Sequence, residues 1–106
     1  MNTTHIRVLL ALASIMPLAA CDSARSGAEA AVRENLKDPE SARFGEFYYN
    51  EDTKRACLTV NAKNSFGGYG EEQEASLINR SSGWVVDDIA NVAHEGCIIS
   101  FADNQD

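Results

Sequence analysis

Hydrophobic and polar residues follow three patterns along this chain. Residues 8–18 form an almost continuous apolar run, preceded by a short polar stretch that ends at Arg7. Residues 28–37 repeat apolar side chains at the three- and four-residue spacing of a helix, whereas residues 55–63 alternate apolar and polar side chains as a strand does. The chain therefore consists of an apolar leader followed by a segment with the periodicities of a folded domain.

The helical pattern predicts one helix over residues 28–37. Ser26 stands at its N-cap position, and Glu29 follows at the spacing of a capping box. We expect the helix to end before Pro39 and a second short turn to begin at Asp38, because the residue before a proline disfavours helical geometry. One face of this predicted helix consists of Ala28, Ala31, Val32, Asn35 and Leu36.

The rest of the chain predicts extended segments separated by turns rich in Asn, Asp, Ser and Gly. A short helical turn after Asp87 or Asp88, ended by Gly96, interrupts this pattern. The expected fold is a small α+β domain in which one N-terminal helix packs on a small antiparallel sheet. The predicted strands cover residues 44–49, 55–63, 69–78, 84–86 and 97–101.

The apolar leader has the length of the hydrophobic core of a secretory signal, and Pro17 near its end would break a membrane-spanning helix. Residues 18–21, with the sequence LAAC, resemble the lipobox of bacterial lipoproteins. That resemblance implies cleavage before Cys21, attachment of diacylglycerol to its thiol and acylation of its new amino group. Three acyl chains would hold the domain firmly at a bilayer. The alternatives are an ordinary secretory peptide with an incidental cysteine and a buried core helix.

The predicted organisation follows from this leader. Residues 1–20 form the signal peptide, residues 21–27 form the lipidated Cys21 and a polar tether, and residues 28–106 form a single domain. The domain would face the periplasm, with the lipid bilayer as its partner through acylated Cys21. By resemblance to enteric lipoproteins, Asp22 favours the inner membrane, and the outer membrane is the alternative.

Charge and size limit the class of protein further. The chain has 9 basic and 16 acidic residues, for a formal net charge of −7. An acidic chain without a basic run is a poor ligand for nucleic acid. No apolar run of membrane-spanning length follows residue 20. A domain this small often needs a covalent staple.

Cys57 and Cys97 are the even pair that remains once Cys21 carries lipid. In an oxidising compartment this pair predicts a disulfide, worth roughly 4 kcal/mol for a loop of this length on the chain-entropy model. Two separately buried thiols are the alternative. The two cysteines do not form a C-x-x-C redox motif. A zinc site would need more ligands than these two thiols and His94, which is the one histidine after the leader.

Two stretches resemble the paired signatures of a family of small bacterial and prophage-encoded proteins, many of them exported or lipidated. The first is LKDPESARF, residues 36–44, and the second is CLTVNAKNSFGGY, residues 57–69. The resemblance covers residues 36–69. It implies a shared fold and carries over no catalytic residue.

The segment from residue 61 to residue 69 is the candidate binding loop, with two adjacent glycines at its centre. Loops on rigid hairpins often carry function, and amides beside aromatic rings suit a peptide or a glycan. Turn chemistry alone is the alternative reading, with Phe66 folded back onto the core. We expect Phe66 to be buried, and Tyr69 and Asn64 to be at least partly exposed. The candidate residues are Asn61, Lys63, Asn64, Phe66 and Tyr69.

The other candidate residues are predicted to have structural roles. Trp84 is expected to anchor the core, and His94 is expected at the surface of a short helix. No G-x-S-x-G nucleophile motif and no EF-hand spacing is present, so the sequence predicts no catalytic residue, cofactor or metal. The acidic residues expected to face solvent are Glu71, Glu72, Glu74, Asp87 and Asp88.

These features predict a membrane-anchored periplasmic lipoprotein that acts as a non-enzymatic binding or envelope-maintenance module, with a periplasmic or envelope protein as its partner. One alternative is a small envelope hydrolase or peptidoglycan-acting factor. It would require two of His94, Asp87, Asp88 and a serine to converge in a pocket. The other alternative is an inhibitor or phage-exclusion lipoprotein that blocks its partner through the candidate loop.

Overall fold

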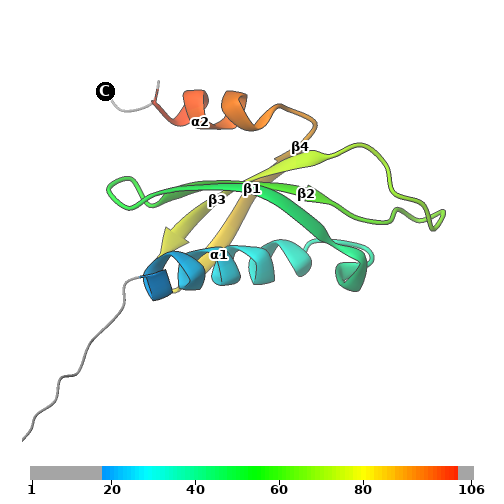
Figure 1. Ribbon diagram of the computed structural model, residues 1–106, viewed down its shortest axis with the longest axis horizontal. Helices are drawn as coiled ribbons and strands as arrows, with labels where there is room; N and C mark the ends of the chain where they lie inside the picture. The colour runs from blue at the N-terminus through cyan, green and yellow to red at the C-terminus, as the bar shows by residue number, and fades with distance from the viewer. Residues whose placement is uncertain (1–17, 103–106) are drawn as a thin grey trace, which may run out of the picture.

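A four-stranded antiparallel sheet lies between two helices, one on each face (Figure 1). The computed structural model describes residues 18–102, with side chains from residue 23 to residue 101. The strands pair in chain order. No helix in this part of the chain is long and apolar enough to cross a membrane. The elements are α1 (Leu18–Arg33), the 3-10 turn η1 (Pro39–Ser41), β1 (Arg43–Asn50), β2 (Arg55–Asn61), β3 (Gln73–Arg80), β4 (Gly83–Ala90) and α2 (His94–Ala102).

The helix α1 packs a face of small residues against the sheet. Ala28 and Val32 are fully buried there, as their spacing predicts, in one cluster with Leu58 and Leu77 of the central strands. A Cβ atom on Gly27 would lie 2.5 Å from the indole ring of Trp84, so the helix approaches the sheet at a distance that needs a glycine. Trp84 is half-buried against this cluster, as predicted.

The predicted ends of this first helix are wrong. The helix α1 begins at Leu18, so Ser26 lies inside it, and the tether expected over residues 21–27 is helical. It ends at Arg33, where the side-chain amide of Asn35 donates a hydrogen bond of 3.0 Å to the carbonyl of Ala31. That bond satisfies a carbonyl of the last turn, which has no partner within the helix.

The predicted fold, with one N-terminal helix packed on the sheet, is wrong. The antiparallel sheet is present, but the segment expected to form a last strand is the helix α2, which covers the second face. The helix α1 is not N-terminal either, since it begins at Leu18. Gly96 and the β-branched Ile98 and Ile99 favour a helix end followed by a strand on local propensity. Burial against the sheet overrides that preference.

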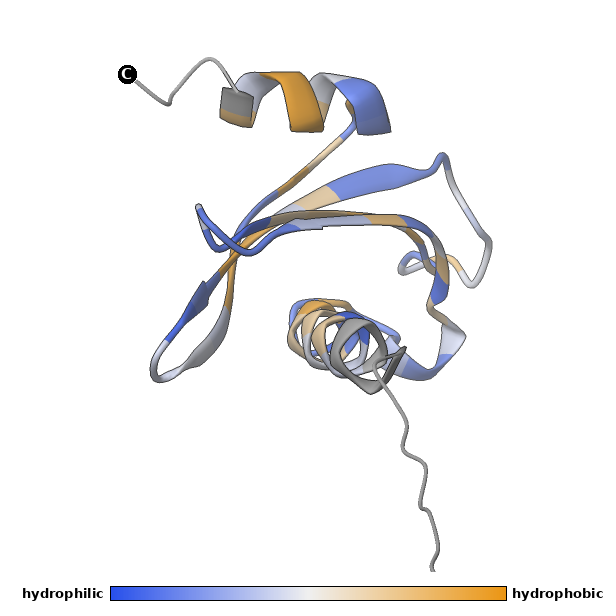
Figure 2. Cartoon of the chain, turned by 60° about the vertical axis from the view of Figure 1, so that its left-hand side comes forward, coloured by the Kyte–Doolittle hydropathy of each residue, from blue (hydrophilic) through white to orange (hydrophobic). Residues whose placement is uncertain are grey.

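The second face of the sheet needs this cover because β2 buries side chains on both sides. Ala56, Leu58 and Val60 pack toward α1, whereas Cys57 points the other way and is fully buried under α2. The predicted disulfide between Cys57 and Cys97 is confirmed and ties α2 to β2. Figure 2 shows the apolar segments along the central strands and in α2.

The last strand is longer than predicted. Asp87 and Asp88 continue β4 instead of capping a helical turn, and Asp88 pairs with Ser76 of β3. Ile89, which the sequence placed in that turn, packs against the core cluster. The third predicted strand, in contrast, begins late: residues 69–72 belong to the loop, and β3 starts at Gln73.

The signal segment is predicted over residues 1–20, and residues 1–17 of it lie outside the described residues. The side chain of Cys21, the predicted site of lipidation, also lies outside them.

Candidate functional site

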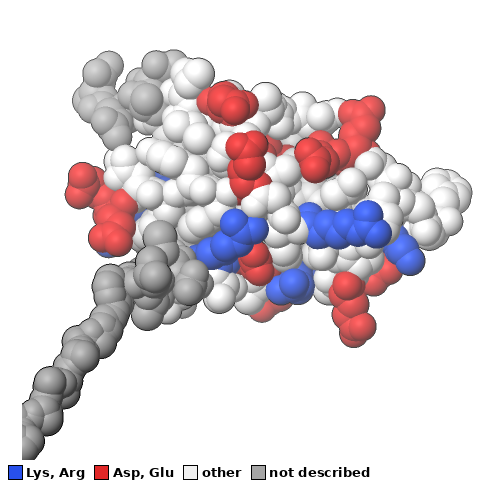
Figure 3. Space-filling view, in the orientation of Figure 1, with Lys and Arg blue, Asp and Glu red and all other residues white. Residues whose placement is uncertain are grey.

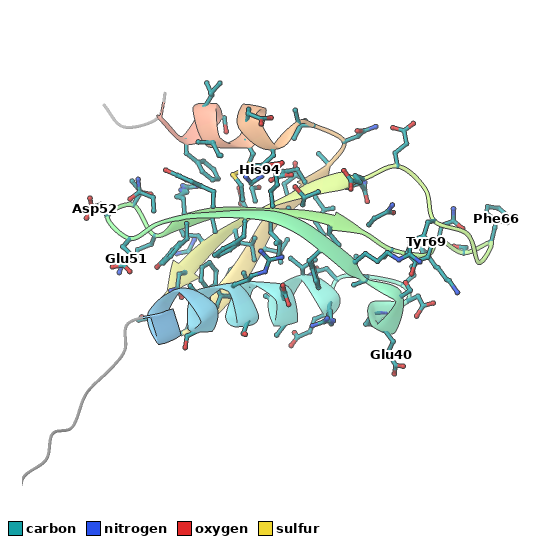
Figure 4. The ribbon with its side chains drawn as sticks, viewed as in Figure 1. Glu40, Glu51, Asp52, Phe66, Tyr69 and His94 are labelled. Atoms are coloured by element: carbon teal, nitrogen blue, oxygen red, sulfur yellow. A yellow bond between two sulfur atoms is a disulfide. The ribbon has the colours of Figure 1, made fainter. Side chains whose placement is uncertain are left out.

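The loop between β2 and β3 projects from one end of the sheet and carries Phe66 at its tip (Figure 4). Its turn is closed by the side chain of Asn64, whose Oδ1 accepts hydrogen bonds from the backbone N–H groups of Phe66 at 2.9 Å and Gly68 at 3.3 Å. The backbone N–H of Asn64 donates to the carbonyl of Gly68 at 2.9 Å. Gly67 adopts a φ of 84°, which favours glycine. These bonds give the loop a defined shape.

The base of the loop is fixed to η1 and β1. The hydroxyl of Tyr69 donates a hydrogen bond of 2.7 Å to the carbonyl of Ser41, and the backbone N–H of Lys63 donates to Ser41 Oγ at 2.8 Å. The guanidinium of Arg43 lies 3.8 Å from the centre of the Tyr69 ring. Tyr69 is half-buried and Asn64 is exposed, so both are at least partly exposed, as predicted. These contacts tie the base of the loop to η1 and β1.

Phe66 is 95% exposed, and the prediction that it packs back onto the core is wrong. The hydrogen bonds to Asn64 direct this part of the turn outward, away from the apolar cluster. A phenyl ring that remains in water forgoes about 1.5–3 kcal/mol of burial free energy. The sequence places this ring at the tip without any compensating contact among the described residues.

A cavity of about 480 Å³ opens at the same end of the sheet, on the side of α1. Three of the five predicted loop residues line it: Asn61, Lys63 and Asn64. Phe66 and Tyr69 do not. The other polar residues of its lining are Asn35, Lys37, Glu71, Gln73 and Asn91. Amide groups offer both donors and acceptors, and two ammonium groups add positive charge, so the cavity suits a polar ligand.

A second cavity, of about 440 Å³, lies on the side of α2 and contains a buried polar cluster that the sequence did not predict. Glu74 is 3% exposed. One of its carboxylate oxygens accepts a hydrogen bond of 2.8 Å from Thr59 Oγ1, and the other lies 2.5 Å from Nδ1 of His94. The side chain of His94 is only 10% exposed. The predictions of a solvent-facing Glu74 and a surface His94 are therefore wrong.

The physical reason for both errors is α2. Its first residue, His94, lies over the face of β3 that carries Glu74, and this cover is missing when the segment is taken for a strand. The remaining acidic predictions agree with the structure, since Glu71, Glu72, Asp87 and Asp88 are exposed. The alternation of Glu74 and Ser76 with the apolar Ala75 and Leu77 is visible in the sequence, but only the register of β3 with β2 places Glu74 on the same face as the buried Cys57.

The buried cluster does not assemble the hydrolase alternative within residues 18–102. Neither Asp87, Asp88 nor a serine lines the cavity beside His94. Thr59 is bonded to Glu74 and not to His94, so it does not stand in the place of a nucleophile next to a base. The sulfur atoms of Cys57 and Cys97 lie within 4.8 Å of the Glu74 carboxylate, but they are joined in the disulfide. The arrangement is that of a structural polar cluster beneath α2.

Comparisons of the chain with protein-family models, with curated proteins and with solved structures found no match.

Proposed function

We propose that this chain is a membrane-anchored lipoprotein of the bacterial envelope, whose domain faces the periplasm and binds an envelope protein without acting as an enzyme. Acylated Cys21 in the LAAC motif provides the anchor, and the loop from residue 61 to residue 69 makes the contact. The observation that carries the binding role is Phe66, 95% exposed at the tip of a loop whose base is fixed.

An exposed ring on a rigid loop is well suited to recognition. Aromatic side chains that fill a pocket on the partner dominate the free energy of many interfaces. The bonds of Asn64 and Tyr69 already order the loop, so little conformational entropy would be lost on binding.

On this proposal, the lipid anchor at Cys21 is directly adjacent to the folded domain. Cleavage before Cys21 would remove the first three residues of α1, Leu18–Arg33, and leave the lipidated residue as the start of the helix. No flexible linker would then separate the bilayer from the domain. Asp22 behind the anchor favours the inner membrane.

The test is capture of an envelope protein by the lipidated protein in detergent, with Phe66→Ala as the variant. Phe66→Ala should lower recovery of the captured partner about thirtyfold, which corresponds to a hot-spot loss of about 2 kcal/mol. Ile99→Ala is the matched control, since Ile99 is another exposed apolar residue, at 58%, on α2. Equal recovery of the same partner by the parent and both variants would remove the loop from the binding role.

A further inference from the structure

Basic side chains gather in a row along the β1 side of the molecule, which we call the basic band. Figure 3 shows blue groups across the middle of this face, at and above the height of α1. Two residues of the band come from α1, one from the start of β1 and one from the loop. The band consists of Arg25, Arg33, Arg43 and Lys63.

Aromatic rings hold the charged groups of this band in place. The guanidinium of Arg33 lies 4.9 Å from the centre of the Phe44 ring, and that of Arg25 lies 5.9 Å from Phe47. Arg43 lies over Tyr69 at 3.8 Å, and Lys63 lies 6.0 Å from the same ring. A ring attracts a cation without cancelling its charge. The band is therefore both ordered and positive.

Most of this charge has no acidic partner. Arg25 forms a salt bridge of 2.8 Å with Glu29 and also donates to the carbonyl of Gly45. Arg33, Arg43 and Lys63 are exposed and form no salt bridge within residues 18–102. Three ordered cations are thus available to an anionic surface.

Acidic groups dominate the side of the molecule under α2. The cavity there is lined by four carboxylates and His94, with no lysine or arginine. Figure 3 also shows acidic groups above and below the band, and Glu29 touches it through the salt bridge to Arg25. The distribution of charge gives this acidic domain one positive edge. The four carboxylates belong to Glu46, Glu72, Glu74 and Glu95.

We propose that the basic band lies on the anionic lipid headgroups of the bilayer that holds Cys21, a contact that rests on the lipid anchor of the proposed function. Arg25 follows Cys21 by four residues of the same helix, or about 6 Å along its axis. Arg33 lies two turns further on. Lysine and arginine side chains this close to an anionic surface are attracted to it. The anchor thus brings the band within reach of the headgroups.

The net negative charge of the chain does not prevent this contact. Repulsion from carboxylates more than about 10 Å from the surface is largely screened at ordinary ionic strength. The anchor also converts the association into an intramolecular one at high effective concentration, so a weak attraction is enough to orient the domain. In this orientation α1 lies near the bilayer, and α2 lies on the other face of the sheet (Figure 1). Phe66 projects beyond the end of the molecule opposite the start of α1 (Figure 4), free for a protein partner.

The experiment compares the acylation rates of two lysines in the lipidated protein reconstituted into floated vesicles. One set of vesicles contains phosphatidylcholine alone, and the other contains equal amounts of phosphatidylcholine and phosphatidylglycerol. A membrane-impermeant acylating reagent modifies exposed lysines, and mass spectrometry measures Lys63 against Lys54, an exposed lysine at the opposite end of β2. On the anionic vesicles the Lys63/Lys54 rate ratio should fall about threefold or more, and about 1 M salt should restore it by shortening the Debye length to about 3 Å.

Charge variants test whether the basic band itself causes the protection of Lys63. Arg33→Gln combined with Arg43→Gln should restore the acylation of Lys63 on anionic vesicles, whereas Arg80→Gln, which changes an exposed arginine outside the band, should not. Phe66→Ala should leave the protection unchanged. Floated protein with equal rate ratios on the two kinds of vesicle would overturn the contact alone. Protein that fails to float would overturn the lipid anchor and, with it, the contact.

Discussion

Gly27 and Gly96 both lie in helices, but the packing around them requires a glycine only at Gly27. Gly27 faces Trp84 at the closest approach of α1 to the sheet, where an added Cβ would lie 2.5 Å from the ring. Gly96 in α2 has open space around the position of a Cβ. One glycine is therefore required by packing, and the other only weakens its helix.

This contrast predicts opposite effects of the same substitution. Gly27→Ala should destabilise the fold by about 1–2 kcal/mol, because a packing clash of about 1–3 kcal/mol outweighs the gain in helix propensity. Gly96→Ala should instead stabilise it by about 0.5–1 kcal/mol. Chemical denaturation of both variants measures the difference. A stable Gly27→Ala protein would contradict the close contact with Trp84.

The buried cluster of Glu74, Thr59 and His94 gives a second prediction at the scale of the residue. Glu74→Ala should lower the free energy of unfolding by about 1–3 kcal/mol, because it leaves the buried polar groups of Thr59 and His94 without their acceptor. Glu72→Ala, at an exposed position two residues away, should change it by no more than about 0.5 kcal/mol.

A double-mutant cycle identifies the pair directly. The combination of Glu74→Ala with His94→Ala should be less destabilising than the sum of the two single changes, by about 0.5–3 kcal/mol, as expected for residues in contact. Additive effects would show that the two side chains do not interact in solution.

At the scale of the element, the disulfide and the polar cluster together hold α2 on the sheet. The helix has an apolar composition and leaves Ile99 58% exposed, so burial alone anchors only part of it. Cys97 joins it to β2, and His94 joins its first turn to β3. The docking of α2 thus depends on two specific links.

Reduction of the disulfide should therefore lower the melting temperature by more than about 10 °C. The expected loss is about 4 kcal/mol for a loop of this length, and each kcal/mol shifts the midpoint of a small domain by roughly 4–8 °C. Calorimetry with and without reductant measures it in a chain carrying Cys21→Ala. The same chain with Cys57→Ser and Cys97→Ser is the control and should not respond to reductant. A midpoint that is insensitive to reduction would show that the bond contributes little.

At the scale of the whole molecule, the proposed anchor sets where the domain sits. The LAAC motif predicts that Cys21→Ala abolishes incorporation of radiolabelled palmitate and leaves an unprocessed or unanchored protein. Asp22→Asn, beside the same cysteine, should still be labelled. Label retained in Cys21→Ala would show that another residue carries the lipid.

Local sequence patterns identified which side chains of a single helix or strand are buried against the neighbouring layer. The spacing of Ala28 and Val32 marked the buried face of α1, and the alternation of Ala56, Leu58 and Val60 marked the α1 side of β2. These patterns can be read from the sequence because each apolar residue reports its own burial against a neighbouring layer. The pairing of Cys57 with Cys97 was predicted from their number and from the oxidising compartment that the leader predicts.

Only the tertiary structure decided what covers the second face of the sheet. Residues 94–102 carry a glycine and β-branched residues, and their helix forms because the far side of β2 and β3 offers Cys57 and Glu74 as partners. Glu74 and His94 are separated by twenty residues, and no local period links them. The exposure of Phe66 has the same origin, because it depends on hydrogen bonds within the loop and on Ser41, far away in the chain. Burial of a polar or aromatic side chain is a property of two surfaces, and the sequence around the residue specifies only one of them.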